Sequence, residues 1–154
     1  MGPMSVPYQL LTIERVALLR RLDFFTGAPG HVLAAVAKEA LEVTFPAGQV
    51  VMSRGEEGDS LFIVVKGHVR IDIGDLHVDD LGPGSVIGEL ALLVAEARSA
   101  TVTALDECLL LRLSKAVFDE LLLDHPEVAG GVITALVRRF RDRGPRSEPH
   151  GAQP

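Results

Sequence analysis

The segment Gly88–Val102, GELALLVAEARSATV, places an acidic and a basic residue beside a glycine in an otherwise apolar stretch. Glu89 opens a short apolar helix, and Arg98 follows just before the chain returns to a strand. A helix N-terminus presents unpaired N–H groups that hold an anion, and Gly88 lets the backbone approach it closely. The Arg98 guanidinium can grip two phosphate oxygens, whereas an ionised Glu89 suits a sugar hydroxyl and repels phosphate. The segment therefore predicts a site for a small phosphate ester of a sugar.

Each of these residues, taken alone, has a simpler explanation. Glu89 suits the dipole of a helix start, Arg98 suits a surface ion pair with Glu89 or Glu96, and Gly88 suits a turn. Their combination inside a glycine-punctuated β region favours the ligand site.

The composition bounds the class of protein. The chain has 154 residues, enough for one domain, and 47% of them are apolar. With a net charge of −6, the chain has no broad basic surface that would attract nucleic acid or an anionic membrane. Neither is therefore an expected partner of this chain. The single Cys108 excludes an internal disulfide, and no long apolar run or secretory signal is present. A cytoplasmic location is expected.

Other polar groups do not form a recognisable catalytic or metal site. His68 and His77 lie on neighbouring β runs without the paired histidines and carboxylate of a metal site, so no metal is expected. Asp79 and Asp80 are adjacent on a strand and point to opposite faces. We expect a protein that is not an enzyme.

The pattern of apolar residues divides the chain into three parts. Helical spacing runs from residue 7 to 40 and again from 114 to 143, with Ser114 as the N-cap of one helix and Pro126 opening the last. Between them, residues 41–113 form short β runs separated by glycine turns, which predicts an antiparallel jelly-roll-like β-roll. The runs are Leu41–Phe45, Gln49–Met52, Leu61–Val65, Val69–Ile73, His77–Leu81, Ser99–Leu105 and Cys108–Leu113.

The two ends are expected to lie outside this domain, which covers residues 6–143. Residues 1–5 look like a cloning remnant or a disordered start, and residues 144–154 form a Pro/Gly-rich tail expected to be disordered.

The segments PAGQVVMSRGEEGDSLFIVVKGHVRI and GELALLVAEARSATV, with the flanking helices, resemble the cyclic-nucleotide-binding domain family. This family includes catabolite-activator-type regulators, regulatory subunits of cyclic-nucleotide-dependent kinases and cyclic-nucleotide-gated channels. The resemblance runs from about Ile13 to Arg143. It implies a β-roll that acts as a regulatory sensor, with cyclic AMP as the favoured ligand, cyclic GMP as the other candidate, and no other cofactor.

The resemblance also implies roles for particular residues. Glu89 would accept a hydrogen bond from the ribose 2′-hydroxyl, and Arg98 would pair with a phosphate oxygen. The backbone at Gly88, Leu90, Ala91 and Ala100 would complete the cradle, and Ser99, whose hydroxyl can reach base or phosphate, admits guanine in the syn form. The last helix would cover the base through Arg138 or Arg139, and periodicity does not decide between them.

The chain departs from the family pattern just before the arginine. Ala97 stands where proline is common, and residues 94–97 contain no turn residue, so the sequence leaves open whether they form a loop or extend the helix toward Arg98. The alternative function is therefore a module that has lost its ligand and serves as a structural, dimerisation or interaction domain.

The resemblance implies partners beyond the nucleotide. The chain is expected to be part of a larger multidomain protein, whose other parts can include a membrane region. A homodimer through the C-terminal helix is the other expected partnership.

Overall fold

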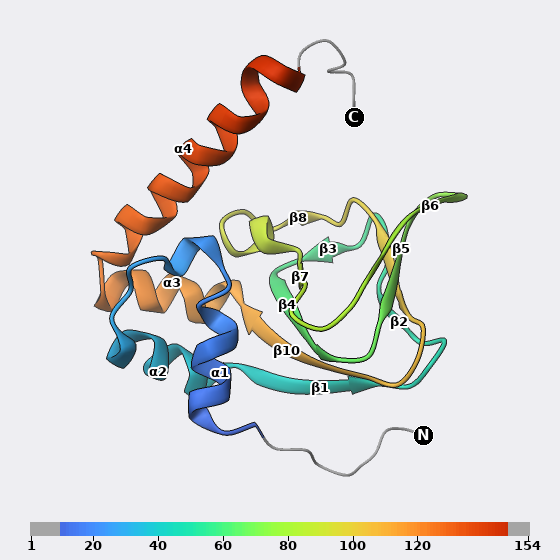
Figure 1. Cartoon of the computed structure of the whole chain (residues 1–154), viewed down its shortest axis with the longest axis horizontal. Coiled ribbons are helices and arrows are strands. Elements are labelled where there is room, and N and C mark those ends of the chain that lie inside the picture. Colours follow the sequence, from blue (N-terminus) through green and yellow to red (C-terminus); the bar gives the residue numbers. More distant parts are fainter. Residues whose placement is uncertain (1–9, 148–154) are drawn as a thin grey trace.

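The computed structural model describes residues 10–147, with side chains described through residue 142. Two antiparallel four-stranded sheets form a roll, and helices pack on one side of it (Figure 1). The predicted β-roll flanked by N-terminal and C-terminal helices is thus confirmed. The expected start, residues 1–5, and residues 148–154 of the expected tail lie outside the described residues.

The first sheet has the order β1-β10-β4-β7, and the second has the order β2-β9-β5-β6. A third, two-stranded ribbon joins β3 to β8. The strands are β1 Leu41–Phe45, β2 Val50–Met52, β3 Glu57–Gly58, β4 Ser60–Lys66, β5 Val69–Ile73, β6 Leu76–Leu81, β7 Val86–Ile87, β8 Glu96–Ala97, β9 Thr101–Ala104 and β10 Cys108–Ser114.

The two central strands of the first sheet, β10 and β4, are buried on both faces, which explains their uninterrupted apolar runs. In β4, Phe62 and Val64 point into the roll, whereas Leu61 and Ile63 pack against the helices. Side chains alternate between faces along a strand, so a strand covered on both sides needs apolar residues at every position. The inner core joins both sheets, because Met52 of β2 lies in the same cluster as Phe62 and Val64.

The helices form a layer on the outer face of the first sheet. They are α1 Thr12–Leu19, the 3₁₀ helix η1 Asp23–Phe25, α2 Gly30–Glu39, the 3₁₀ helix η2 Glu89–Leu92, α3 Lys115–Asp124 and α4 Val128–Ser147. Phe24 and Phe25 are almost fully buried, and each ring lies about 6 Å from the ring of Phe118 (6.3 and 6.0 Å between centroids). The hydroxyl of Ser114 accepts a hydrogen bond from the N–H of Val117 at 3.2 Å, as expected of the N-cap of α3.

The last helix extends away from the roll and reaches past its predicted end (Figure 1). It begins at Val128, two residues after Pro126, and continues through Gly144 and Pro145 to Ser147, so the expected tail does not begin at 144. At the other end Gly131 packs closely, since a Cβ there would lie 3.1 Å from the carbonyl oxygen of Phe24.

Across residues 10–147, none of the helices combines the length and the apolar character needed to cross a bilayer.

Candidate functional site

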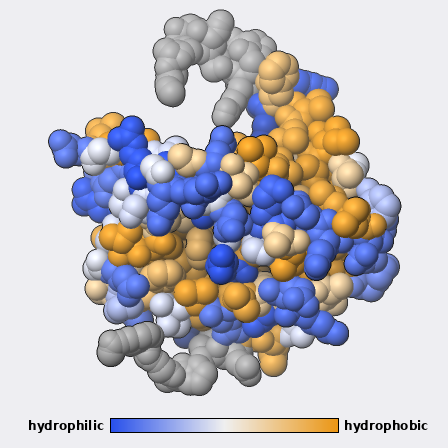
Figure 2. Space-filling view, turned by 180° about the vertical axis from the view of Figure 1, so that it is seen from behind, coloured by the Kyte–Doolittle hydropathy of each residue, from blue (hydrophilic) through white to orange (hydrophobic). Residues whose placement is uncertain are grey.

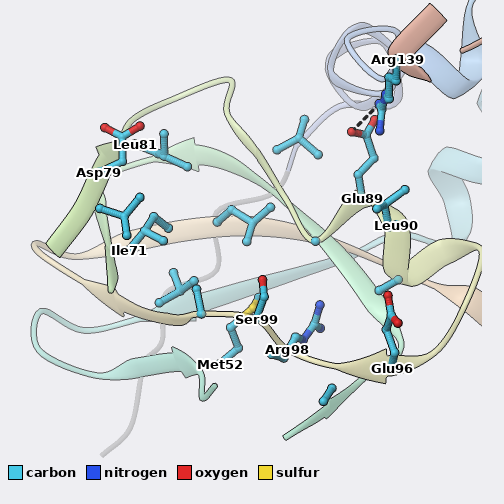
Figure 3. A pocket seen from close by; sticks show the side chains of 18 residues that line it. Met52, Ile71, Asp79, Leu81, Glu89, Leu90, Glu96, Arg98, Ser99 and Arg139 are labelled. Carbon is cyan, nitrogen blue, oxygen red and sulfur yellow. Dashed lines mark hydrogen bonds and ion pairs between the residues drawn. The ribbon is translucent and has the colours of Figure 1, made fainter. Parts of the chain in front are cut away.

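A cavity of about 550 Å³ opens between the second sheet and the segment that links β7 to β9. All seven residues that the sequence singles out in this segment line it: Gly88, Glu89, Leu90, Ala91, Arg98, Ser99 and Ala100. Figure 3 shows Arg98 and Ser99 on one side of this space and Glu89 on the other. The structure therefore brings the predicted groups together around one cavity.

Two glycines make room for the Arg98 guanidinium. Gly88 has φ 77°, and a Cβ on it would lie 2.6 Å from Arg98 Nη1 and 3.3 Å from the carbonyl oxygen of Ser60. A Cβ on Gly58 would overlap the guanidinium itself. Only glycine adopts this φ without strain, so the close approach predicted for Gly88 has both a conformational and a steric cause. Gly58 was not singled out from the sequence.

Residues 94–97 do not extend the helix toward Arg98. The 3₁₀ helix η2 ends at Leu92, and Glu96 and Ala97 form strand β8 against Glu57 and Gly58. The missing turn residues are replaced by backbone pairing with a distant part of the chain.

This pairing continues through Arg98 itself. Its N–H donates to the carbonyl of Glu56 at 2.8 Å, and its carbonyl accepts from the N–H of Gly55 at 2.9 Å. These bonds fix the backbone that carries the guanidinium. The position of Arg98 therefore does not require turn residues at positions 94–97.

The Arg98 side chain is partly buried, and its Nε has no hydrogen-bond partner among the described residues. Burial lowers the pKa of the guanidinium below its usual value, although the negative charges of Asp59 and Glu56 act in the opposite direction. A guanidinium stays protonated in proteins despite such a shift. Arg98 lines the cavity and has unused donor capacity, as a residue of an anion-binding site requires.

Glu89 forms an ion pair with α4 rather than with Arg98. Its Oε1 accepts from Arg139 Nη2 at 2.7 Å, and Arg139 also lies 3.3 Å from Asp23 Oδ2 (Figure 3). Arg139 lines the cavity, whereas Arg138 is exposed to solvent. Of the two arginines left open by the sequence, Arg139 is the one next to the site, with its guanidinium on Glu89.

The short helix expected to begin at Glu89 is the 3₁₀ helix η2. The N–H of Ala91 donates to the carbonyl of Gly88 at 3.0 Å, which closes a 3₁₀ turn. Leu90 is half exposed at the mouth of the cavity, whereas Ala91 is buried. In this conformation the Ala91 amide is already engaged within the turn.

The apolar end of the cavity was not predicted. Ile71 of β5, Leu81 of β6 and Val102 of β9 line it together with Met52. The alternation of side chains along each strand identifies the residues that point inward. Which of them share one wall of the cavity depends on the pairing register between strands that are distant in the sequence. An apolar wall beside a charged end suits a ligand with a flat ring and a phosphate.

The histidines considered for a metal site are paired elsewhere. His68 Nδ1 lies 3.0 Å from Asp106 Oδ2, and His77 Nε2 lies 2.8 Å from Asp80 Oδ1. Both pairs are exposed and do not line the cavity.

Comparison with known proteins agrees with the fold. The family model described as cyclic nucleotide-binding domain matches residues 42–125, more than half of the chain. A CRP-like cAMP-activated global transcriptional regulator of Mycobacterium tuberculosis is 29% identical over 129 residues, which span 80% of this chain and 58% of that protein. A cyclic nucleotide-gated potassium channel of Mesorhizobium japonicum is 41% identical over 112 residues, or 73% of this chain and 31% of the channel.

Among solved structures, the N-terminal domain of a transcriptional regulator from Streptomyces coelicolor A3(2) has a TM-score of 0.74 and 33% identity. The match covers 81% of this chain and 90% of that domain. The chain spans less than two thirds of the length of the two curated relatives described above. With its β-roll, its flanking helices and the match over residues 42–125, this chain belongs to the cyclic nucleotide-binding domain family.

Proposed function

We propose that this chain is a regulatory sensor that binds a cyclic nucleotide in the cavity lined by Gly88–Ala91 and Arg98–Ala100. The observation that carries the proposal is the Arg98 guanidinium at the cavity: its buried Nε has no partner among the described residues and lies against Gly58, and its Nη1 lies against Gly88. The guanidinium would grip the cyclic phosphate, and Glu89 would accept from the ribose 2′-hydroxyl. The functional unit would be residues 6–143.

Cyclic AMP is the ligand we favour. The regulator from Mycobacterium tuberculosis is described as cAMP-activated, and it matches most of this chain. Ser99 lies on the cavity wall and is exposed, so its hydroxyl can also meet guanine, which keeps cyclic GMP as the second ligand.

Transmission would pass through the C-terminal helix. Arg139 joins α4 to Glu89 of the binding segment, so a ligand that contacts Glu89 acts on a group that already holds the helix. A ligand can shift α4 only as far as it binds one arrangement more tightly than the other.

The output belongs to the parent protein in this proposal. The relatives are longer than this chain and include regulators and channels. We propose a cytoplasmic domain without catalytic activity that senses the nucleotide for such a parent. The chain itself would contact neither nucleic acid nor membrane.

The alternative is a module that has kept the roll and lost the ligand. It would leave the buried Nε of Arg98 without a partner, and such an unsatisfied donor costs about 1–3 kcal/mol.

Thermal unfolding with cyclic AMP or cyclic GMP distinguishes the two functions. A ligand that binds only the native state stabilises it by about 2.7 kcal/mol at a hundredfold excess over Kd. We therefore expect the unfolding midpoint to rise with cyclic AMP, and 5′-AMP serves as the control that lacks the cyclic ester. An unchanged midpoint at millimolar concentrations of both cyclic nucleotides would support the ligand-free module instead.

The exposed apolar side of α4 favours a second copy of this chain as a partner. Ile133, Val137 and Phe140 are all at least half exposed and recur at helical spacing, and Figure 2 shows apolar side chains gathered along this helix. Such a stripe is typical of a helix that pairs with another. We expect sedimentation equilibrium to show a dimer that Val137→Glu weakens at least tenfold, whereas the exposed Arg138→Glu changes it little. A monomer at high micromolar concentration would rule the pairing out.

A further inference from the structure

Arg139 connects three elements of the structure at one point. Its Nη2 donates to Glu89 Oε1 of η2 at 2.7 Å and lies 3.3 Å from Asp23 Oδ2 of η1. Its guanidinium also lies over the Phe24 ring, 5.2 Å from the centroid, within the range of a cation–π contact. Glu89 is thus tied, through one side chain of α4, to the helical layer.

The anchor of this connection is rigid. Phe24 is fully buried, its ring packs on Phe118, and Gly131 of α4 lies close to its carbonyl oxygen. Because packed interiors resist displacement, the point at which Arg139 meets Glu89 is well defined.

The ion pair leaves acceptor capacity on Glu89. An ionised carboxylate offers about four lone-pair sites on two oxygens, and the bond to Arg139 uses one site on Oε1. Glu89 also lines the cavity that a sugar would enter.

We propose that Arg139 is a positioning residue that holds the Glu89 carboxylate in the orientation that accepts a ribose 2′-hydroxyl. This inference rests on the proposed function, since it concerns the same cavity. Without Arg139, Glu89 would have to be ordered when the ligand binds, and fixing such a side chain costs about 0.5–1.5 kcal/mol, or roughly two- to tenfold in affinity.

The charge of Arg139 has a separate effect. Glu89 and a cyclic phosphate are both anionic, and a cation between α4 and η2 offsets their repulsion. Burial acts to lower the pKa of Arg139, but the hydrogen bonds and charges of Glu89 and Asp23 outweigh it and raise the pKa above its ordinary value. The guanidinium therefore remains charged whenever Glu89 is ionised.

The orienting effect is separated from the charge effect by comparing a ligand with and without the hydroxyl. Titration calorimetry with cyclic AMP and 2′-deoxy cyclic AMP, and with the corresponding guanine pair, gives the ratio of the two affinities. A hydrogen bond to a charged acceptor predicts a ratio of about 10 to 100 for the unaltered protein. We expect Arg139→Ala to lower this ratio about three- to tenfold, and the loss of charge to weaken both ligands together.

Three variants control the result. Arg138→Ala removes an exposed arginine from the neighbouring position and should leave the ratio within twofold. Asp23→Asn weakens the other contact of Arg139 and keeps its bond to Glu89, so it should lower the ratio less than Arg139→Ala does. Arg139→Lys keeps the charge but lacks the planar guanidinium. Compared with Arg139→Ala, it should recover more of the affinity for both ligands than of the ratio between their affinities.

The outcomes separate this inference from the proposed function. If the unaltered protein binds no cyclic nucleotide, the proposed function fails. If it binds and Arg139→Ala leaves the ratio unchanged, the function stands and the positioning role is wrong. Tighter binding of cyclic AMP by Arg139→Ala would show that Arg139 competes with the ribose, which also overturns the proposal.

Discussion

Arg98→Ala is expected to weaken binding of cyclic AMP by about 100- to 1,000-fold while leaving the protein folded. Each hydrogen bond to a charged group contributes about 1.5–3 kcal/mol, and the planar guanidinium can make two such bonds to one phosphate. Tenfold in affinity corresponds to about 1.4 kcal/mol, so loss of both bonds at the lower end of this range, about 3 kcal/mol, already weakens binding more than 100-fold. Titration calorimetry measures it directly.

The same substitution should not lower the stability of the ligand-free protein. Arg98 Nε is buried without a partner, and burial disfavours the charged form of the side chain. Removal of an unsatisfied group from a folded protein removes its desolvation cost, so we expect the free energy of unfolding to stay constant or rise by about 1 kcal/mol. A residue that serves binding at the expense of folding behaves in this way.

Two further variants make the interpretation specific. Arg98→Lys keeps the charge and loses the fork, so its affinity should fall between those of the original protein and Arg98→Ala. Arg54→Ala removes an exposed arginine that does not line the cavity, and it should bind as the original does. Equal affinities for Arg98→Ala and the original protein would disprove the role assigned to Arg98.

The interior of the roll could be predicted from the sequence because apolar patterning encodes it. The run Leu61–Val65 and the run Cys108–Leu113 each lie within a strand, with bounds that differ from β4 and β10 by one residue at most. Ser114 was identified as an N-cap from its type and place alone, since the cap is a local contact.

The ribbon of β3 and β8 could not be predicted in the same way. Its four residues, Glu57, Gly58, Glu96 and Ala97, have no apolar periodicity, and three of them are exposed. They pair because the roll brings two distant turns together, and their backbone groups then satisfy each other. This non-local pairing decides how Arg98 is presented, which is why composition alone left that question open.

The last helix shows a second limit of periodicity. Val132 and Ile133 are neighbouring apolar residues of this helix, yet Val132 is buried and Ile133 is 60% exposed. Spacing defines a side of a helix but not the neighbour that covers it. For the same reason it could not choose between Arg138 and Arg139, which differ in the structure by their contact with η1 and η2.

The second large effect on ligand binding is expected for Gly58→Ala, because Gly58 lies directly against the Arg98 side chain. A methyl group there would occupy the position of the Arg98 guanidinium, so the two cannot keep their present places. Gly58 does not have a positive φ, and the displaced group is the end of a flexible side chain. We expect a small change in the unfolding midpoint but a loss of cyclic AMP affinity of at least tenfold, approaching that of Arg98→Ala.

The double variant tests whether this loss acts through the guanidinium. If Gly58→Ala weakens binding only by moving Arg98, it should have no further effect on affinity once Arg98 is alanine, so the two losses should be strongly non-additive. Gly130→Ala is the matched control, because a Cβ at this exposed helical position meets nothing within 4 Å. Additive losses in the double variant would mean that Gly58 acts through the β3–β8 ribbon instead, and that its closeness to Arg98 has no part in ligand binding.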